Sequence, residues 1–357
     1  MKALRVLHLV SVRWYNACAH YALCMGKAMR GQGVEIFFAG LPGSPVLEKA
    51  SQEGFQIAPG SFWRVRALIK EKGIHAVFSH RGEDHFTASL LNLFSRGRVR
   101  HIGVRADIRR PRNHALNRFF YRACADRHVV PSAFMRDYFK DLKVPPERVS
   151  VLPQPFDGKG FADRPARSPL RTRLDVADGE VLAGVIARLD PVKGHAVVMA
   201  AANLLAPESR IRFLVSGETC NVSPGDLQAM LTPAAAKRVL FMDRVPDVRE
   251  LLHALDIGIV ASTGSEAVCR VALEMAAAGL PVIGTNVHSV PEIITHEKGG
   301  LIIPPSDPRA MAGAVRRLAG DAILRSAMGR FNQRRVEEEY GLDAFGRKLA
   351  DLCGGLL

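Results

Sequence analysis

Two cations in the second half of the chain have the types and spacing to bind a diphosphate. Arg188 and Lys193 lie on either side of a proline-containing turn that directly follows the apolar run Val181–Ile186. Two cations fixed beside one strand end suit a diphosphate, because its negative charge grows when it acts as a leaving group. Loop arginines and lysines are also common as solvated surface residues, so this pair alone leaves both interpretations open.

Two carboxylates form the next candidate group. Glu266 lies in a loop after the apolar run Ile257–Val260, and Glu274 lies about two turns into an expected helix. Their spacing allows both side chains to face one side, where they can accept hydrogen bonds from hydroxyl groups beside a phosphate at the helix N-terminus. The alternative for Glu274 is an ion pair with Arg270, four residues earlier on the same helix.

Short apolar runs that alternate with helical patterns are expected to position these residues. In the first half, strands are expected at Leu4–Val10, Val34–Phe38, His75–Phe78, Arg100–Val104 and Arg127–Val130, with helices such as Ala19–Arg30 and Ala115–Ala123. In the second half, strands are expected at Val181–Ile186, Arg212–Val215, Val239–Met242, Ile257–Val260, Pro281–Ile283 and Leu301–Ile303, with helices at His195–Leu205, Val248–His253, Val271–Ala278 and Pro308–Leu318. The alternation predicts an α/β protein with parallel sheets covered on both faces, which bind ligands beyond the carboxyl ends of their strands.

The segment Val149–Phe161, rich in proline and glycine, separates the two series and is predicted to be an interdomain linker. We therefore expect an N-terminal lobe of residues 1–155 and a C-terminal lobe of residues 156–340, each doubly wound around one sheet. A last helix, at about 341–357, is expected to pack back on the N-terminal lobe.

The order of these motifs resembles that of the family 4 glycosyltransferases. The matching elements are the segment from Arg188 to Lys193-Gly194, the stretch Arg238–Leu252, the Glu-x7-Glu pair, Pro291–Ile294, and the linker Val-Leu-Pro-Gln-Pro-Phe-Asp. The resemblance is specific over about 149–318 and continues more weakly through the N-terminal half. It implies the GT-B fold, in which two Rossmann-like lobes face each other across a cleft.

The resemblance also implies a function and roles for individual residues. It implies a retaining, metal-independent transfer of a sugar from a UDP-, GDP- or ADP-linked donor, with no other cofactor. Arg188 and Lys193 would stabilise the departing diphosphate, and Glu266 would bind hydroxyls of the transferred sugar. The other donor-binding candidates are Glu274 at the ribose, Arg244 and Val245 by the base, and Gly217, Ala267, Val268, Cys269 and Arg270. In the N-terminal lobe, the candidate loop and acceptor residues are Asn16, Ala17, Cys18, His80, Arg105 and Asp107.

Three segments depart from the family pattern. The first loop usually carries a Gly-Gly pair that lets the backbone approach donor phosphates, but here it reads Trp14–Cys18 without glycine. Glycine-rich spacing after the first glutamate is replaced by Ala267–Cys269, and Ala106 stands where many members have histidine. These departures motivate a second hypothesis, that the chain is a non-catalytic nucleotide-sugar-binding scaffold subunit on the same fold.

The basic residues are concentrated in the N-terminal half. Residues 1–155 contain 25 Lys and Arg against 11 Asp and Glu, whereas residues 156–357 contain 24 of each, so the first part carries the whole net charge of +14. We expect this lobe to face an anionic partner, such as a membrane surface or an anionic glycolipid. The family resemblance implies that the acceptor is a glycolipid or cell-surface glycan, of the kind found in lipopolysaccharide core synthesis. No signature of a nucleic-acid-binding module accompanies the charge, so nucleic acid is not an expected partner.

The segment Arg109–Arg122 is the candidate membrane contact, because it combines arginines with an apolar stripe. For Leu116, Phe120 and Ala123 themselves, packing on the sheet is the favoured interpretation, which leaves the arginines unexplained. Six cysteines without a Cys-x-x-Cys pair indicate reduced thiols, and the first ten residues favour a buried strand over a signal peptide. The expected location is the cytoplasm, peripherally on the inner face of the plasma membrane.

His75, His80 and His85 do not share a helical face, so no metal site is expected.

Overall fold

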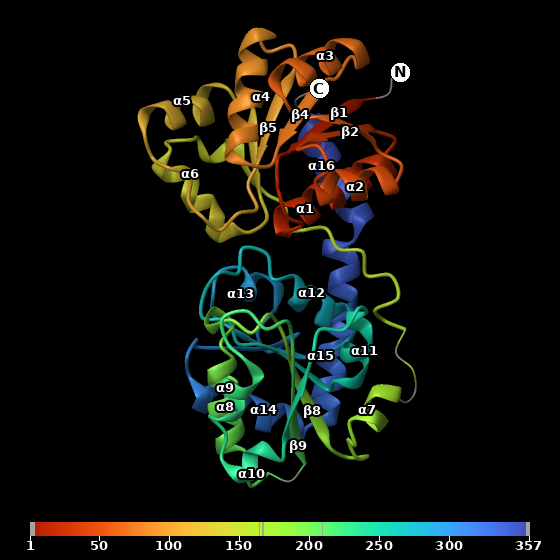
Figure 1. Cartoon of the computed structure of the whole chain (residues 1–357), viewed down its shortest axis with the longest axis vertical. Coiled ribbons are helices and arrows are strands. Elements are labelled where there is room, and N and C mark those ends of the chain that lie inside the picture. Colours follow the sequence, from red (N-terminus) through yellow and green to blue (C-terminus); the bar gives the residue numbers. More distant parts are fainter. Residues whose placement is uncertain (1–3, 164, 166–167, 209, 355–357) are drawn as a thin grey trace. The chain divides into compact units, whose positions relative to one another are not determined.

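The computed structural model describes residues 4–163, 165, 168–208 and 210–354, which form two compact α/β units (Figure 1). Contacts divide the chain into Met1–Asp157 together with Glu339–Leu357, and Gly158–Glu338. The sheet of the first unit has seven strands and that of the second has six. The prediction of two doubly wound α/β lobes is therefore confirmed.

The first sheet is parallel throughout, with strand order β3-β2-β1-β4-β5-β6-β7. Its strands are β1 (Arg5–Val10), β2 (Glu35–Gly40), β3 (Gln56–Pro59), β4 (Ala76–Ser79), β5 (Arg100–Val104), β6 (Arg127–Val130) and β7 (Val149–Val151). The helical segments between them are α1 (Ala17–Gly31), α2 (Pro45–Gln52), α3 (Phe62–Lys72), α4 (Gly82–Phe94), α5 (Ala115–Ala123), η1 (Ala133–Arg136), α6 (Asp137–Asp141) and η2 (Pro146–Arg148).

The second sheet is also parallel and has the order β10-β9-β8-β11-β12-β13. Its strands are β8 (Val181–Ile186), β9 (Ile211–Ser216), β10 (Val239–Met242), β11 (Ile257–Val260), β12 (Val282–Thr285) and β13 (Gly300–Ile303). Its helical segments are α7 (Pro169–Arg173), η3 (Pro191–Lys193), α8 (His195–Leu204), α9 (Pro224–Gln228), α10 (Pro233–Ala236), α11 (Val248–Ala254), α12 (Arg270–Ala277), α13 (Val290–Ile293), α14 (Pro308–Gly320) and α15 (Ala322–Arg335).

Both faces of the first sheet are buried, which explains why its central strands are continuous apolar runs. In β1, Val6 and Val10 pack in the core that includes α1, whereas Leu7 and Leu9 pack in a separate core on the opposite face with Val65 of α3. Side chains of one strand alternate between faces, so consecutive apolar residues of a strand serve both cores.

The chain returns to the first unit at its end. After α15 it passes through the π-helical turn η4 (Val336–Tyr340) into α16 (Leu342–Gly354). Figure 1 draws α16 in blue beside α1, and Phe345 packs edge-on against Tyr21 with ring centroids 6.1 Å apart. Leu349 is fully buried in the same core.

Two sequence expectations differ from the structure. Val149–Val151, expected in the linker, forms the edge strand β7. On α5, the stripe Leu116, Phe120 and Ala123 was expected to face the sheet, but Leu116 is 55% exposed and the buried side chains are Phe120 and Tyr121. The helix turns its face because Tyr121 stacks on a buried histidine, which the apolar pattern of α5 alone does not indicate.

No helix in the described part of the chain is long and apolar enough to cross a membrane.

Five histidines are buried in the first unit. The Nδ1 atom of His8 lies 2.9 Å from Nε2 of His80, and the His8 ring stacks between Phe38 and Phe78. The other three, His85, His101 and His128, pack around Tyr121 and Ser79. Burial lowers the pKa of each group, to about 3 for His8 and His128, to about 4 for His101, and well below the usual range for the other two.

These histidines predict that the first unit loses stability in mild acid. Below pH 6.5 they gain protons in the unfolded chain but not in the folded one, so stability falls as pH falls toward their folded pKa values. Each contributes up to about 1.4 kcal/mol per pH unit in that window. Asp84 acts in the opposite direction, because burial raises its pKa to about 7, but one carboxyl opposes five imidazoles. Thermal unfolding should show a steep decline in Tm between pH 6 and pH 4.5.

A His101→Gln variant provides the control. The amide can still bond to Ser79, the partner of the His101 Nε2 atom. It cannot titrate, so the variant should show a shallower dependence of Tm on pH. A wild-type Tm that stays constant between pH 7 and pH 4.5 would contradict the prediction.

Candidate functional site

The predicted phosphate-binding residues lie where the strand order of the second sheet reverses. Strands β8 and β11 are paired neighbours, although β9 and β10 lie between them in the chain. Arg188 and Lys193 follow β8, and Glu266 follows β11. In doubly wound sheets the loops at this switch point part to opposite faces and leave a crevice, which is the usual ligand site.

A glycine brings the two loops together. Gly194 has φ +72°, and a Cβ there would lie 1.9 Å from the carbonyl oxygen of Ala261 at the end of β11. The backbone N–H of Thr263 donates to the carbonyl of Val192 at 2.9 Å. Any residue with a side chain at position 194 would push the Lys193 loop away from β11.

Lys193 and Glu266 form an ion pair across these loops. The Nζ atom of Lys193 lies 2.5 Å from Oε1 of Glu266, and the hydroxyl of Ser262 donates to the same oxygen at 2.5 Å. The lysine side chain is 20% exposed and the glutamate side chain 6%. The lysine charge is therefore held at the rim of the site by a carboxylate that is almost fully buried.

The loop after β12 fixes the backbone of Glu266. The hydroxyl of Ser289 donates to the Glu266 carbonyl at 2.8 Å, and the Glu266 N–H donates to Nδ1 of His288 at 3.3 Å. The hydroxyl of Thr285 donates to the carbonyl of Ser262 at 2.6 Å. The sequence did not indicate that this loop supports Glu266.

Arg188 is much freer than Lys193. Its side chain is 58% exposed, and its ion-pair partner is Asp190, at 3.9 Å. Asp190 is itself held by the N–H of Val192 and the amide of Asn221, and the Val192 hydrogen bond is the main cause of its lowered pKa. Arg188 can therefore turn toward an anion without losing a buried contact.

Glu274 is buried and paired with Arg270. The Nε atom of Arg270 lies 2.7 Å from Oε1 of Glu274, and the carboxylate side chain is 7% exposed. Burial raises the pKa of Glu274, and the arginine partly offsets this. The structure thus contains the helical ion pair that was the alternative for Glu274, and this pair does not exclude contact with a ribose.

The remaining donor candidates lie on the loops around this crevice. Ala267 and Val268 are half-buried, and Cys269 is buried with its thiol pKa raised, mainly by burial and then by Glu266. Gly217 follows β9, and a Cβ there would lie 1.8 Å from the carbonyl oxygen of Ala187. On the loop after β10, Arg244 is 78% exposed and lies 3.9 Å from Glu218, and Val245 is half-buried.

In the first unit, the predicted loop residues have structural contacts. The side chain of Asn16 caps α1 by accepting the N–H of Ala19 at 3.1 Å, and the adjacent Ala17 is exposed. The thiol of Cys18 donates to the carbonyl of His80 at 3.1 Å, and burial raises its pKa to about 12. Cys18 is therefore a neutral anchor for the loop after β1 and not a nucleophile.

Asp84 is a residue whose role the sequence did not indicate. It lies in the first turn of α4, is 1% exposed, and accepts the N–H of Ser11 at 3.0 Å. It thereby ties the loop after β1 to the loop after β4, its neighbour in the sheet. The available signal was an acidic residue in the first turn of the helix that follows β4.

Arg105 and Asp107 follow β5 and belong to an arginine-rich loop. Asp107 accepts hydrogen bonds from the side chain and backbone of Arg109, with the shortest at 2.7 Å. Burial opposes ionisation of Asp107, but these bonds lower its pKa overall. Arg105 donates to the carbonyl of Arg109.

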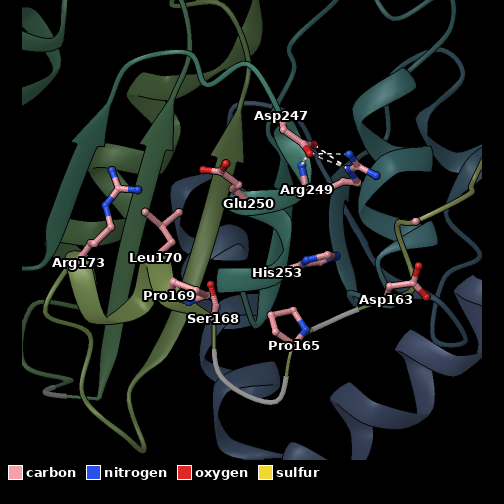
Figure 2. A pocket seen from close by; sticks show the side chains of 11 residues that line it. Asp163, Pro165, Ser168, Pro169, Leu170, Arg173, Asp247, Arg249, Glu250 and His253 are labelled. Carbon is pink, nitrogen blue, oxygen red and sulfur yellow. Dashed lines mark hydrogen bonds and ion pairs between the residues drawn. The ribbon is translucent and has the colours of Figure 1, made fainter.

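A cavity of about 530 Å³ lies elsewhere in the second unit, between the linker and α11 (Figure 2). Its lining includes Pro165, Leu170 and His253, and at its rim Asp247 binds the guanidinium of Arg249. None of the predicted donor-binding residues lines it. The residues at the strand ends remain the better candidates, because Arg188, Lys193 and Glu266 follow the two strands of the switch point. Across the described residues, no cluster of His, Cys, Asp and Glu could hold a metal ion.

Two family models match the chain and together span most of it. Residues 180–321 match the model described as glycosyl transferases group 1, and residues 19–158 match glycosyltransferase family 4. The chain belongs to the family 4 glycosyltransferases. The resemblance stated from the sequence motifs is thereby confirmed.

Curated relatives match over part of their length. The chain is 32% identical over 234 residues, 60% of this chain and 53% of the relative, to the D-inositol 3-phosphate glycosyltransferase of Kineococcus radiotolerans. It is 26% identical over 175 residues, 46% of this chain and 45% of the relative, to the lipopolysaccharide 1,2-N-acetylglucosaminetransferase of Salmonella typhimurium. The chain thus spans about half the length of these relatives.

Solved structures support the fold. The Anabaena protein Alr3699/HepE, crystallised with UDP, matches with a TM-score of 0.86 at 16% identity, covering 99% of this chain and 100% of that one. The sucrose-phosphate synthase of Thermosynechococcus elongatus matches with a TM-score of 0.75 at 16% identity, covering 99% of both chains. The predicted GT-B fold is therefore confirmed.

The contrast between Lys193 and Arg188 predicts different effects on stability. Lys193→Ala leaves the buried Glu266 carboxylate without its cation, so we expect a loss of about 3 kcal/mol in the free energy of unfolding. Arg188→Ala removes an exposed side chain and should change stability by less than about 0.5 kcal/mol. Urea unfolding of both variants measures the difference.

The double variant Lys193→Met/Glu266→Gln tests the cause of that loss. It removes both charges and keeps a polar partner for Ser262, so most of the stability should return. If the double variant is as unstable as Lys193→Ala, the unpaired carboxylate is not the cause.

Proposed function

We propose that the chain transfers a sugar from a nucleotide diphosphate to a glycolipid or cell-surface glycan, with retention of anomeric configuration and without a metal ion. The observation that carries this proposal is the Lys193–Glu266 ion pair at the switch point of the second sheet, with Arg188 on the same loop as Lys193. The location is the cytoplasm, at the inner face of the plasma membrane.

The charges of the crevice suit a departing diphosphate. Arg188 is exposed, so it can follow the phosphate oxygens as their charge grows. Lys193 is held in place by Glu266 and is already desolvated on one side, so it needs little reorganisation during the reaction. These two cations supply the positive charge that a divalent ion provides in metal-dependent transferases.

The two carboxylates differ in what they can offer a donor. One oxygen of Glu266 is occupied by Lys193 and Ser262, which leaves the second oxygen for a hydroxyl of the transferred sugar. Glu274 is held by Arg270 on α12, where it can accept a ribose hydroxyl. A nucleotide donor is supported by the structural likeness to Alr3699/HepE, which was crystallised with UDP and with UDP-glucose.

Arg188→Ala is the cleanest test of the phosphate site, because the residue has no buried contact. Loss of one charge-stabilising donor should lower turnover about a hundredfold and leave folding intact. Lys193→Ala should cost at least as much, but part of its effect will come from the fold. Donors are first identified by thermal shift with UDP-, GDP- and ADP-sugars, since binding to the native state raises Tm. Turnover is then followed as nucleotide release, with and without excess chelator.

Arg334→Ala removes another exposed arginine of the same unit, on α15, and should leave turnover unchanged. Activity that disappears with chelator would contradict metal independence. A wild-type protein that binds a donor but never releases nucleotide with any acceptor would support the scaffold hypothesis instead.

A cavity beside α5 supports the membrane part of the proposal. Its volume is about 570 Å³. Its lining has no acidic residue and includes four cations, which are Arg118, Arg122, Lys143 and Arg148. None of the four forms an ion pair within the described part of the chain. Phe119, which also lines it, is 50% exposed, and Leu116 on the same helix is 55% exposed. Cations around exposed apolar side chains suit the headgroup region of an anionic bilayer.

Arg118→Glu/Arg122→Glu should release the protein from anionic vesicles. Basic residues near anionic lipid contribute roughly 1 kcal/mol each, and the attraction is screened by salt. Wild type should therefore sediment with phosphatidylglycerol vesicles, less so as salt rises, and not with phosphatidylcholine vesicles. The variant should remain in the supernatant and still bind the donor.

Arg64→Glu/Arg98→Glu is the matched control, with the same change in net charge at two exposed positions near Trp63 and Phe94 on α3 and α4. It should still bind vesicles. If this variant loses binding and the α5 variant keeps it, the membrane surface is assigned to the wrong face.

A further inference from the structure

A third cavity, also in the first unit, differs in shape and chemistry from the one beside α5. Its volume is about 300 Å³, and it lies beyond the carboxyl ends of the paired strands β4 and β5. His80 and Arg81 follow β4, and Arg105 and Asp107 follow β5. This is the edge of a doubly wound sheet at which ligands bind.

The lining of this cavity is strongly basic. Five arginines line it and Asp107 is its single carboxylate; the arginines are Arg81, Arg105, Arg109, Arg110 and Arg112. Its two histidines add no charge, because burial lowers the pKa of both His80 and His85 well below the usual range. The lining therefore carries a net charge of +4.

Only part of that charge is compensated nearby. Asp107 is fully engaged by Arg109, and Arg110 reaches Asp141 at 3.1 Å, outside the cavity lining. Arg81 and Arg112 form no ion pair with any residue that the structure describes. The Nε atom of Arg105 is buried and has no hydrogen-bond partner among those residues. A buried guanidinium N–H without a partner is costly, and an anion in the cavity would stabilise the Arg105 charge.

The lining also includes aromatic side chains. Phe86 packs edge-on against Phe120 with ring centroids 5.0 Å apart, and Phe86 is 46% exposed. Both line the cavity, as does Asn117, whose amide nitrogen donates to the carbonyl of Arg112. Apolar walls with a few convergent charges are the usual composition of a small-molecule site.

We propose that this cavity binds a sugar that carries a phosphomonoester, with the phosphate on the arginines and the sugar ring against the aromatic side chains. A phosphomonoester has a charge near −2 at neutral pH, and the arginine fork matches its oxygens in pairs. A single carboxylate would leave most of the lining charge uncompensated. The assignment of this sugar phosphate as the acceptor rests on the proposed function; the binding site itself does not.

Calorimetry with matched probes tests the site. Glucose 6-phosphate should bind at least tenfold more tightly than glucose, and more tightly than inorganic phosphate, because it contacts both the arginines and the aromatic side chains. Dihexanoyl phosphatidic acid carries the same phosphomonoester on a lipid and should bind less tightly than glucose 6-phosphate. Arg81→Gln/Arg112→Gln should weaken glucose 6-phosphate binding at least tenfold. Arg118→Gln/Arg122→Gln, in the cavity beside α5, should leave it unchanged.

Several results would overturn the proposal. Equal affinity for glucose 6-phosphate and inorganic phosphate would indicate adventitious anion binding only, and tighter binding of the lipid probe would assign the site to a headgroup. Equal loss in the two double variants would indicate a general charge effect. Donor binding is measured on the same samples. If the chain binds glucose 6-phosphate as expected but no nucleotide sugar, the phosphate site stands and the proposed transfer fails.

Discussion

The ion pair between Lys193 and Glu266 is the interaction on which the candidate donor site depends. It joins loops from two strands that are adjacent in the sheet but far apart in the chain, and Gly194 makes their close approach possible. The pair fixes one cation while Arg188 stays mobile at the surface. One preorganised and one adaptable cation suit a ligand whose charge changes during reaction.

In the first unit, the interior and the cavities at the surface contain different ionisable side chains. Five of its histidines are buried, burial lowers their pKa, and they pack as aromatic side chains between the sheet and the helices. Eight of its arginines line two separate cavities, one at the carboxyl edge of the sheet and one beside α5. The charge excess of residues 1–155 is therefore divided. One group of arginines surrounds exposed apolar side chains, and the other lines a smaller cavity with aromatic side chains. Of the segment Arg109–Arg122, Arg112 lines the smaller cavity while Arg118 and Arg122 line the larger.

Most strands of both sheets could be predicted because buried parallel strands require continuous apolar runs. β1 was expected at Leu4–Val10 and spans Arg5–Val10, and α5 has the expected bounds. β3 was missed, since Gln56–Pro59 is mostly exposed at the sheet edge and has no apolar run. The helix predicted at α5 was correct, but the prediction of its buried face was wrong. Tyr121 faces the interior because it stacks on a buried histidine of α4, a contact that the apolar pattern of α5 does not indicate.

The sequence by itself determined the family, the two doubly wound sheets and the residue types at the strand ends, because motif order and hydrophobic pattern are local properties of the chain. Only the tertiary structure decided which partners those residues have. Glu266 pairs with a lysine 73 residues earlier in the chain, and the Asp84 carboxylate binds the backbone of Ser11. Such contacts depend on strand order, which places loops side by side regardless of their separation in sequence. The division of the arginines between two cavities has the same origin, because each cavity is formed by segments from different elements of the fold.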